Sequence, residues 1–275
     1  LHGLGCFPGE DKSSLGMLGM HGNYEANLAM NKCDLMINVG ARFDDRVTGR
    51  LDAFSPDSIK FHIDIDQSSI NKNVKVNFHT NTDITLTLKE INSFIESNHI
   101  NFGDKDYSNW WGQINEWRKK ECLHYEQGDE VIKPQHAISR LYELTKQKDT
   151  FVTTEVGQHQ MWAAQYYKFS KPNRWITSGG LGTMGFGMPA AVGAQMANPD
   201  SLVIDIAGEA SFLMNIQEIA TAVQYKLPIK IFILNNEYMG MVRQWQELLH
   251  GSRYSESYVD ALPDFKKLAE SFNAV

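Results

Sequence analysis

The sequence predicts an α/β protein with two doubly wound parallel-sheet domains, and three features of the chain indicate this fold class. Short apolar runs typical of buried parallel strands occur in both halves, and segments with helical spacing lie between them. A polar stretch containing several tryptophans separates the halves. A length of 275 residues also fits two domains better than one.

The first half contains two strand-like runs and one helix-like stretch. Residues 35–40 form an apolar run that ends at a glycine, and residues 59–66 form the next one. Residues 83–94 carry apolar side chains at helical spacing. Alternating strands and helices indicate a parallel sheet, so we assign residues 1–97 to the C-terminal part of a first domain.

Residues 98–130 are predicted to form a linker with helical content. The stretch is polar, and it contains the pair Trp110 and Trp111 together with Trp117. We expect these tryptophans to pack on a neighbouring surface. The charges at 118–121 are expected to face solvent.

Residues 131–275 are predicted to form a second α/β domain. We expect helices at 136–144 and 214–224 and strands at 150–154, 201–207 and 229–234. The last two strands and the helix between them form one βαβ unit, whose crossover should be right-handed.

Composition excludes several classes of protein. The formal net charge of −7 and the pI of about 5.7 argue against nucleic acid as a partner, because phosphate contacts need clustered Lys and Arg. Three scattered cysteines, Cys6, Cys33 and Cys122, predict neither a disulfide framework nor a structural zinc site. No apolar run approaches the roughly 18 residues of a membrane span. No leader is visible, so we expect a cytoplasmic protein, and both ends are expected to lie inside a longer chain.

Two loops carry the most informative residues. The sequence Gly208-Glu209-Ala210-Ser211 follows one predicted strand, and Asn236 follows the next. A small-residue loop that enters a helix exposes backbone N–H groups that suit a diphosphate. The Glu209 carboxylate and the Asn236 amide oxygen are hard ligands that suit Mg²⁺. Alone, the first loop is typical of an ordinary strand-to-helix turn, but the asparagine after the next buried strand favours a metal-bridged diphosphate site.

This pattern resembles the fingerprint of thiamine-diphosphate enzymes, in which Gly-Asp-Gly is followed one strand later by Asn-Asn. The resemblance implies that Glu209, Asn236 and the main-chain carbonyl of Tyr238 hold Mg²⁺. The sequence departs from the fingerprint at two positions, because Glu209 replaces Asp and Ala210 replaces the second Gly. The geometry of the metal site must therefore shift.

Three further motifs resemble the acetolactate synthase (acetohydroxyacid synthase) large catalytic subunits. Residues 155–162 resemble their diphosphate loop, residues 178–187 their second glycine-rich loop, and residues 238–246 the helix that lines their substrate channel. The resemblance assigns cofactor contacts to Val156, Gly157, Gln158, His159, Gly208, Glu209, Ala210, Ser211, Asn236, Tyr238, Met239 and Gly240.

The same resemblance implies roles next to the reacting groups. The Gly182 carbonyl would accept a hydrogen bond from the aminopyrimidine of the cofactor, and Met184 would hold the cofactor in a bent shape. Met241, Val242 and Trp245 match positions of the substrate pocket. Without the motifs around them, Met184 would be interpreted as a core filler, and the apolar and aromatic pair as plain helix core.

The first half resembles the flavin-binding loops of the same family at residues 19–22 and 39–49. The resemblance places FAD against Met20, His21, Gly40, Ala41, Arg42, Asp44 and Val47, with Asp64, Ile65, Asp83 and Ile84 near its adenosine end. Arg46 matches an arginine of the substrate channel, where a guanidinium can bind a keto-acid carboxylate with two hydrogen bonds. In isolation, the Asp-Asp-Arg cluster also fits a surface ion-pair loop.

The resemblance implies an enzyme that decarboxylates pyruvate on thiamine diphosphate. The hydroxyethyl unit would pass to a second 2-keto acid, pyruvate or 2-ketobutyrate, in the first common step of branched-chain amino acid biosynthesis. Thiamine diphosphate, Mg²⁺ and FAD are the implied cofactors. A homodimer or tetramer with its active site across the dimer interface is expected, and a small regulatory subunit is a possible partner.

Family members contribute a Glu from an N-terminal pyrimidine-binding domain, and we expect the sequence from Leu1 onward to lack that domain. We therefore expect the isolated chain to be inactive. The alternatives are another thiamine-diphosphate carboligase, decarboxylase or oxidase, such as pyruvate oxidase or glyoxylate carboligase, and a non-catalytic nucleotide-binding module. The departure at Glu209 and Ala210 is the feature that favours the last of these.

Overall fold

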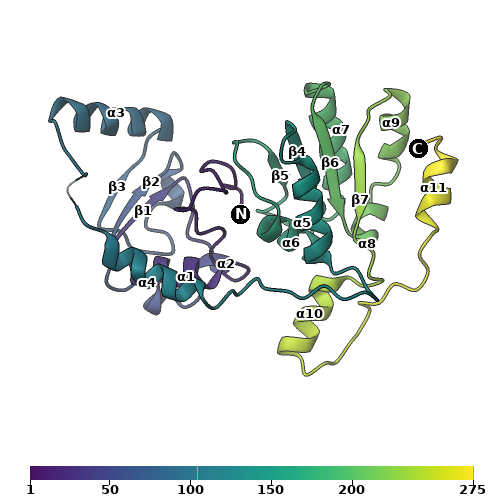
Figure 1. The fold of residues 1–275 in the computed structure, drawn as a ribbon, viewed down its shortest axis with the longest axis horizontal. Coiled ribbons are helices and arrows are strands. Elements are labelled where there is room, and N and C mark those ends of the chain that lie inside the picture. Colours follow the sequence, from purple (N-terminus) through teal and green to yellow (C-terminus); the bar gives the residue numbers. More distant parts are fainter. Residues whose placement is uncertain (104, 275) are drawn as a thin grey trace. The chain divides into compact units, whose positions relative to one another are not determined.

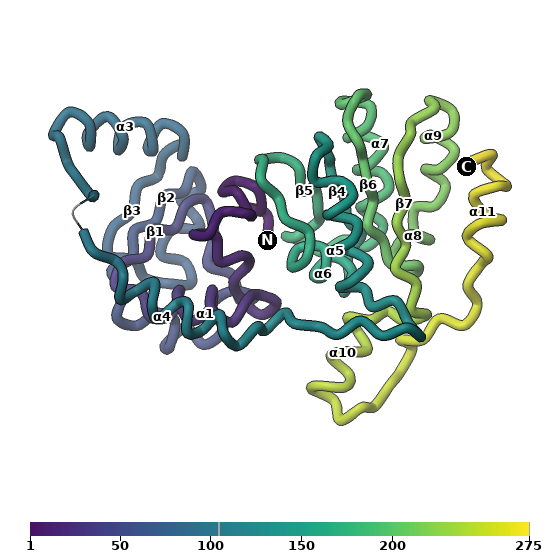
Figure 2. Tube along the Cα trace, in the orientation of Figure 1, coloured from purple at the N-terminus to yellow at the C-terminus, as the bar shows by residue number. Residues whose placement is uncertain are grey.

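A computed structural model describes residues 1–103 and 105–274 of the chain. The chain folds into two compact units (Figures 1 and 2). One unit is Leu15–His124, and the other combines Leu1–Ser14 with Tyr125–Val275. No described helix is long and apolar enough to cross a membrane.

The unit Leu15–His124 is built on a three-stranded parallel sheet of order β1-β2-β3. Its elements are α1 (Tyr24–Lys32), β1 (Leu35–Val39), α2 (Asp45–Thr48), two 3-10 turns (Leu51–Ala53 and Gln67–Ser69), β2 (Ile59–Ile63), β3 (Phe78–Thr80), α3 (Ile84–Ser97) and α4 (Ser108–Arg118). The buried residues Phe43, Phe54 and Val74 form a core cluster of this unit.

One face of this sheet leaves apolar side chains exposed. Leu35 pairs in register with Ile59, and Phe61 pairs with Phe78. Because strand side chains alternate between the two faces, paired residues point the same way. The exposed residues of this face are Leu35, Ile37, Val39, Ile59 and Phe78.

The second unit is built on a four-stranded parallel sheet of order β5-β4-β6-β7. Its elements are α5 (Pro134–Thr145), β4 (Thr150–Thr154), α6 (Gln158–Tyr166), β5 (Trp175–Thr177), α7 (Gly187–Ala197), β6 (Leu202–Ala207), α8 (Glu209–Leu213), α9 (Glu218–Gln224), β7 (Lys230–Ile233), α10 (Gly240–Leu249) and α11 (Phe265–Ser271). After β4, the chain adds β5 on one side of this strand and later adds β6 on its other side. Right-handed crossovers then place α6 on one face and α7 and α9 on the other, which is the doubly wound arrangement.

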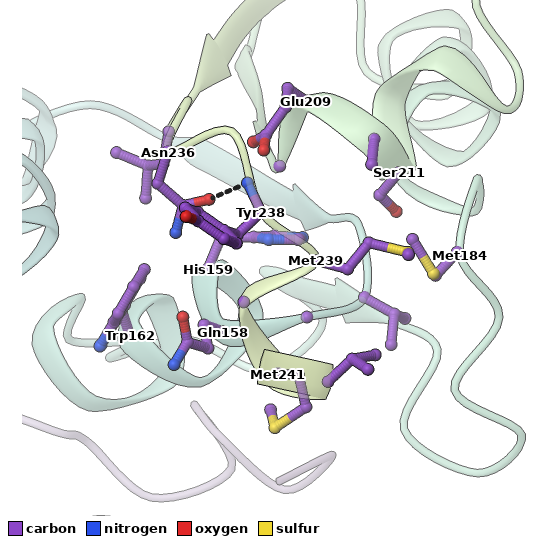
Figure 3. Close-up of a pocket in the computed structure, with 17 residues that line it drawn as sticks. Gln158, His159, Trp162, Met184, Glu209, Ser211, Asn236, Tyr238, Met239 and Met241 are labelled. Atoms are coloured by element: carbon purple, nitrogen blue, oxygen red, sulfur yellow. Dashed lines mark hydrogen bonds between the residues drawn. The ribbon is translucent and has the colours of Figure 1, made fainter. Parts of the chain in front are cut away.

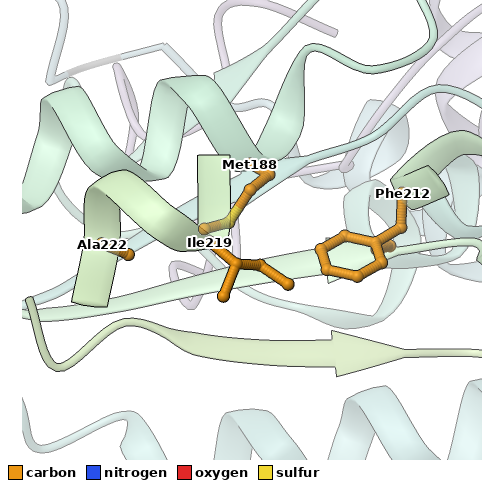
Figure 4. Close-up of a cluster of buried hydrophobic side chains, with 5 residues drawn as sticks. Met188, Phe212, Ile219 and Ala222 are labelled. Atoms are coloured by element: carbon orange, nitrogen blue, oxygen red, sulfur yellow. The ribbon is translucent and has the colours of Figure 1, made fainter. Parts of the chain in front are cut away.

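The core of the second unit encloses its central strands. Every residue of β4 is buried. Met188 from α7, Phe212 from α8 and Ile219 from α9 pack into one buried cluster with Ala207 at the end of β6 (Figure 4). This cluster fixes the segments that follow β6.

The predicted fold class is confirmed, and most predicted elements agree with the structure. Two strands of three residues, β3 and β5, were not predicted, because such short strands give no periodic pattern. The expected helix at 214–224 is wrong in its bounds, since α8 ends at Leu213 and α9 begins at Glu218. At the break, the Asn215 side chain donates a hydrogen bond of 2.6 Å to the Gly185 carbonyl.

The polar middle of the chain contains α4, which packs on α1 within the unit Leu15–His124. Trp110 and Trp117 meet edge to face, with ring centroids 5.7 Å apart. This contact lies within α4, and packing of the tryptophans on a neighbouring surface stays a prediction. The bounds 1–97, 98–130 and 131–275 stay predictions.

Candidate functional site

The candidate site lies where the strand order of the second sheet reverses, between β4 and β6. In parallel sheets, the loops after two such strands turn away from each other and leave a crevice. A cavity at this edge is lined by Val156, Gly157, Gln158, His159, Trp162, Met184, Gly208, Glu209, Ala210, Ser211, Leu234, Asn236, Tyr238, Met239, Gly240, Met241 and Val242 (Figure 3). All twelve residues predicted to contact the diphosphate end of a cofactor are among them.

Glu209, Asn236 and Tyr238 lie close together in the lining of this cavity (Figure 3). Glu209 is only 1% exposed, and its carboxylate reaches the backbone of Asn236 and Tyr238. Burial raises the pKa of this carboxyl group, and hydrogen bonds from those backbone amides partly offset the rise. The Asn236 side-chain oxygen accepts a hydrogen bond of 3.2 Å from the Tyr238 amide.

This group of donors fits a hard divalent cation. The Oε1 atom of Glu209 is buried and has no hydrogen-bond partner among the described residues, so it is available to a ligand. The described residues contain no cluster of three or more His, Cys, Asp or Glu side chains suited to a metal. One carboxylate with amide and carbonyl oxygens is a donor set typical of Mg²⁺, which completes its shell with phosphate and water.

His159 is held tightly beneath the cavity. A Cβ atom on Gly157 would lie 2.7 Å from Cε1 of His159, and one on Gly208 would lie 2.6 Å from Nδ1. Both loops therefore need glycine to accommodate the ring. Burial lowers the pKa of His159 to about 4, although a hydrogen bond with the Glu155 backbone opposes the shift. The imidazole is thus neutral near pH 7, and its Nε2 atom has no partner among the described residues.

Methionines form much of the apolar wall. Met184 comes from the loop between β5 and α7, while Met239 and Met241 flank the start of α10. Gly182 lies outside the lining residues. It adopts a left-handed φ of +69°, and a Cβ at this position would lie 3.8 Å from Cγ1 of Val156. The structure therefore places Met184 at the cavity but not Gly182.

The helix α10 separates this cavity from a more open hollow. Met241 and Val242 line both spaces, and Trp245 lines only the open one, together with Gln246, His250 and Arg253. Close packing fixes the start of the helix, since a Cβ on Gly240 would collide with the Gln158 side chain.

Two lining residues were missed by the sequence-based site prediction, Trp162 and Leu234. Trp162 follows Gln158 by one helical turn on α6, so both side chains lie on the same face of that helix. This spacing could have identified Trp162. Leu234 follows β7 directly and has no comparable signal.

The residues predicted to contact FAD lie in the unit Leu15–His124, several of them at the carboxyl ends of its strands. Gly40 follows β1 with a φ of +63°, and its Cβ position lies 2.6 Å from Cδ1 of Ile84. Asp64 follows β2, is buried, and lies 3.4 Å from Nε2 of His62. Asp83 caps α3 by accepting a 3.1 Å hydrogen bond from the Leu86 amide.

A second group of these residues surrounds α2. The Met20 amide donates a 2.7 Å hydrogen bond to the Arg46 carbonyl, and Asp44 caps α2 by accepting from the Arg46 amide. Burial, together with the charge of Arg46, lowers the pKa of His21. The structure thus brings Met20, His21 and the 44–47 turn together.

The ion pairs of this turn are exposed. Arg42 lies 3.7 Å from Asp44, and Arg46 lies 3.7 Å from Asp45. Among the other predicted contacts, Ala41 accepts a hydrogen bond from Asn38 through its carbonyl, Val47 packs on the core cluster, and Ile65 is exposed. Their roles toward FAD and substrate stay predictions.

Comparison with known proteins identifies the parts of the chain. Residues 1–91 match the family "Thiamine pyrophosphate enzyme, central domain", and residues 155–275 match "Thiamine pyrophosphate enzyme, C-terminal TPP binding domain". The chain is 48% identical over 275 residues to the acetolactate synthase isozyme 3 large subunit of Escherichia coli (strain K12), covering 100% of the chain and 48% of that protein.

Other relatives are nearly as similar along the whole chain. It is 46% identical over 275 residues to the acetolactate synthase large subunit of Haemophilus influenzae, covering 100% of the chain and 48% of that protein. It is 45% identical over 278 residues to the chloroplastic acetolactate synthase 1 of Nicotiana tabacum, covering 98% of the chain and 41% of that protein. The chain spans about half the length of the curated relatives that it matches. The chain belongs to the thiamine pyrophosphate enzymes and, within them, is a homologue of the acetolactate synthase large subunits.

Proposed function

We propose that the chain carries the diphosphate- and metal-binding part of an acetolactate synthase. The reaction would decarboxylate pyruvate and join the remaining two-carbon unit to a second pyruvate or to 2-ketobutyrate. The observation that carries this proposal is the buried Glu209 carboxylate, whose unpartnered oxygen lies in a cavity with Asn236 and Tyr238. The similarity to acetolactate synthase large subunits along the whole chain supports the same reaction.

In this proposal, the cavity residues divide into three groups. Glu209, Asn236 and the Tyr238 carbonyl would hold Mg²⁺, and backbone N–H groups of the loops at 156–159 and 208–211 would bind the diphosphate. Bound thiamine diphosphate supplies the electron sink for decarboxylation. The methionines, including Met184, would exclude water and hold the reactants in place.

The remaining parts of the proposal concern FAD, substrate and assembly. FAD would bind beside Gly40, Asp64 and the 44–47 turn, and Arg46 would bind a keto-acid carboxylate. Met241 and Trp245, which share the open hollow, would line the path of the second keto acid. We further propose a cytoplasmic homo-oligomer with its active site across a dimer interface and a small regulatory subunit as a possible partner.

The test is an assay of the complete gene product with pyruvate, Mg²⁺, thiamine diphosphate and FAD, in which the product is identified directly. We expect acetolactate, formed only when the cofactors are present. A different product would move the assignment to another carboligase or an oxidase. Absence of Mg²⁺-dependent cofactor binding would favour a non-catalytic module.

Variants of Glu209 test the metal site itself. Glu209→Ala should lower Mg²⁺-dependent turnover by more than about 100-fold, because loss of a direct ligand exceeds the usual effect of losing a supporting group. Glu209→Asp should retain Mg²⁺ binding, since the carboxylate remains. Glu218→Ala on α9 is the control, because that carboxylate does not line the cavity. Equal turnover in Glu209→Ala and the control would contradict the proposed metal site.

A further inference from the structure

A buried carboxylate without an assigned role lies behind the candidate site. Glu155 directly follows β4 and is fully buried. Its backbone amide donates a 3.1 Å hydrogen bond to the Ile206 carbonyl, which ties it to the neighbouring strand. Its side chain does not line the cavity, so it has no direct access to a ligand there.

Both oxygens of the Glu155 side chain accept hydrogen bonds. Oε1 accepts a 3.0 Å hydrogen bond from the Met188 amide in the first turn of α7. Oε2 accepts a 3.0 Å hydrogen bond from the Ser211 hydroxyl, which in turn accepts one of 3.3 Å from the Gly185 amide. The carboxylate thus holds both ends of the segment 185–188 that follows Met184.

This segment has little freedom to find another position. Gly185 has a left-handed φ of +84°, and a Cβ on Gly187 would lie 2.7 Å from the Glu155 amide nitrogen and 2.8 Å from the Thr154 carbonyl carbon. The Gly185 carbonyl also accepts a hydrogen bond from Asn215. The loop is therefore fixed against β4 at one end and against the segment after α8 at the other.

A second buried carboxylate, Asp205, lies close by but makes different contacts. It accepts a 3.0 Å hydrogen bond from the Thr153 hydroxyl through Oδ1, and its Oδ2 atom has no partner among the described residues. Burial, together with the charge of Glu155, raises the pKa of Asp205 well above its usual value. Its Oδ1 atom also packs against Gly187, but no hydrogen bond among the described residues joins the Asp205 side chain to the 185–188 segment.

We infer that Glu155 is a positioning residue that fixes Met184 against the cavity through Ser211 and the 185–188 segment. The position of the loop follows from hydrogen bonds of this chain alone. Only its effect on catalysis rests on the proposed function. Buried hydrogen bonds to a charged group are stronger than those between neutral groups, so removing this carboxylate should release the loop.

Hydrogen-exchange mass spectrometry on the complete, cofactor-free gene product tests the inference. Glu155→Ala should speed exchange of the peptide covering 183–188 by about tenfold or more, whereas peptides of β4 and β6 should change less. Glu155→Gln should remain within about threefold of the wild type, because its amide oxygen can still accept from Met188. Asp205→Asn is the matched control: it keeps the shape of the side chain that packs against Gly187 and removes no hydrogen bond to the loop, so exchange of the loop should stay unchanged.

Steady-state kinetics of the loaded enzyme gives the second measurement. Glu155→Ala should lower kcat about tenfold with little change in KM for pyruvate, and Glu155→Gln should restore most of it. Equal acceleration of exchange in the loop and in the strands would show that Glu155 only stabilises the fold, and would overturn the inference. An unchanged loop in Glu155→Ala would overturn it as well. A wild type that binds no thiamine diphosphate would refute the proposed function, while the exchange measurement would still decide the role of Glu155.

Discussion

The two parallel sheets of this chain carry similar loops but differ in the order of their strands. The sheet β1-β2-β3 is followed at its carboxyl edge by Gly40 and Asp64, and the sheet β5-β4-β6-β7 by Gly208 and Glu209. In the first sheet the chain adds each strand on the same side, and Gly40 packs against Ile84. In the second sheet the order reverses between β4 and β6, and the loops there surround a cavity.

The sheets also differ in what covers them. All of β4 is buried, whereas alternate residues of β1 are exposed. Glycine and acidic residues follow strands in both sheets. In the second sheet, the reversal of strand order places the loops that carry them around one cavity.

The largest expected difference between the sheets is the loss of stability when a glycine beside each sheet is replaced by alanine. Gly187→Ala should destabilise the second unit by about 3 kcal/mol, because the new Cβ collides with the Asp205 side chain and with backbone atoms of β4 and Glu155. Gly40→Ala should cost only about 1 to 2 kcal/mol, mainly for its left-handed φ of +63°. The atom nearest its Cβ is the end of the flexible Ile84 side chain.

Hydrogen exchange measured separately on peptides of each sheet checks this pair of variants. Each variant should speed hydrogen exchange mainly in the unit that contains the substitution. A cost for Gly40→Ala as large as that for Gly187→Ala would show that the first sheet is as tightly packed as the second, and would remove the contrast.

A pair of valines gives the next largest effect. Val152→Ala in β4 should cost about 2 kcal/mol, since Val152 is 0% exposed and the change leaves a cavity. Val39→Ala in β1 should cost less than about 1 kcal/mol, because Val39 is 41% exposed. Denaturant unfolding of the complete gene product measures both. Equal costs would show that the exposed face of β1 is covered in solution.

Sequence patterns predicted the parts of this comparison that depend on local residues. The runs at 35–40 and 150–154 correspond to β1 and β4, and the fingerprint at Glu209 and Asn236 predicted residues that share one cavity. These signals are local because the residues that indicate each strand or loop lie within that one segment of the sequence.

The features that the sequence patterns did not predict depend on contacts between segments that are distant in the sequence. The break between α8 and α9 accompanies the hydrogen bond from Asn215 to Gly185, and the shifted pKa of His159 follows from burial between two loops. The periodicity and composition of the sequence do not indicate the helix break or the lowered pKa of His159. The position of Gly182 outside the cavity lining likewise depends on how its loop folds.

The smallest expected effect on the wild type is the net pH dependence that remains when two groups of the second unit titrate in opposition. His159 has a pKa lowered from 6.5 to about 4, so its contribution to stability is present above pH 6.5 and is lost as the pH falls toward 4. Asp205 has a pKa raised well above 3.8, so its contribution is present below pH 3.8 and is lost as the pH rises through the folded pKa. Between these limits the two contributions oppose each other.

Single variants separate the contributions of His159 and Asp205 to the pH dependence of stability in the cofactor-free protein. Asp205→Asn should make the free energy of unfolding rise more steeply with pH than in the wild type, by up to about 1.4 kcal/mol per pH unit above pH 3.8 and below the raised pKa of Asp205. His159→Gln should make it less steep by a similar amount between pH 4 and 6.5. Denaturant unfolding at several pH values gives both slopes. Parallel curves for the wild type and both variants would mean that neither group titrates differently on folding, and would contradict the burial on which the contrast between the two sheets depends.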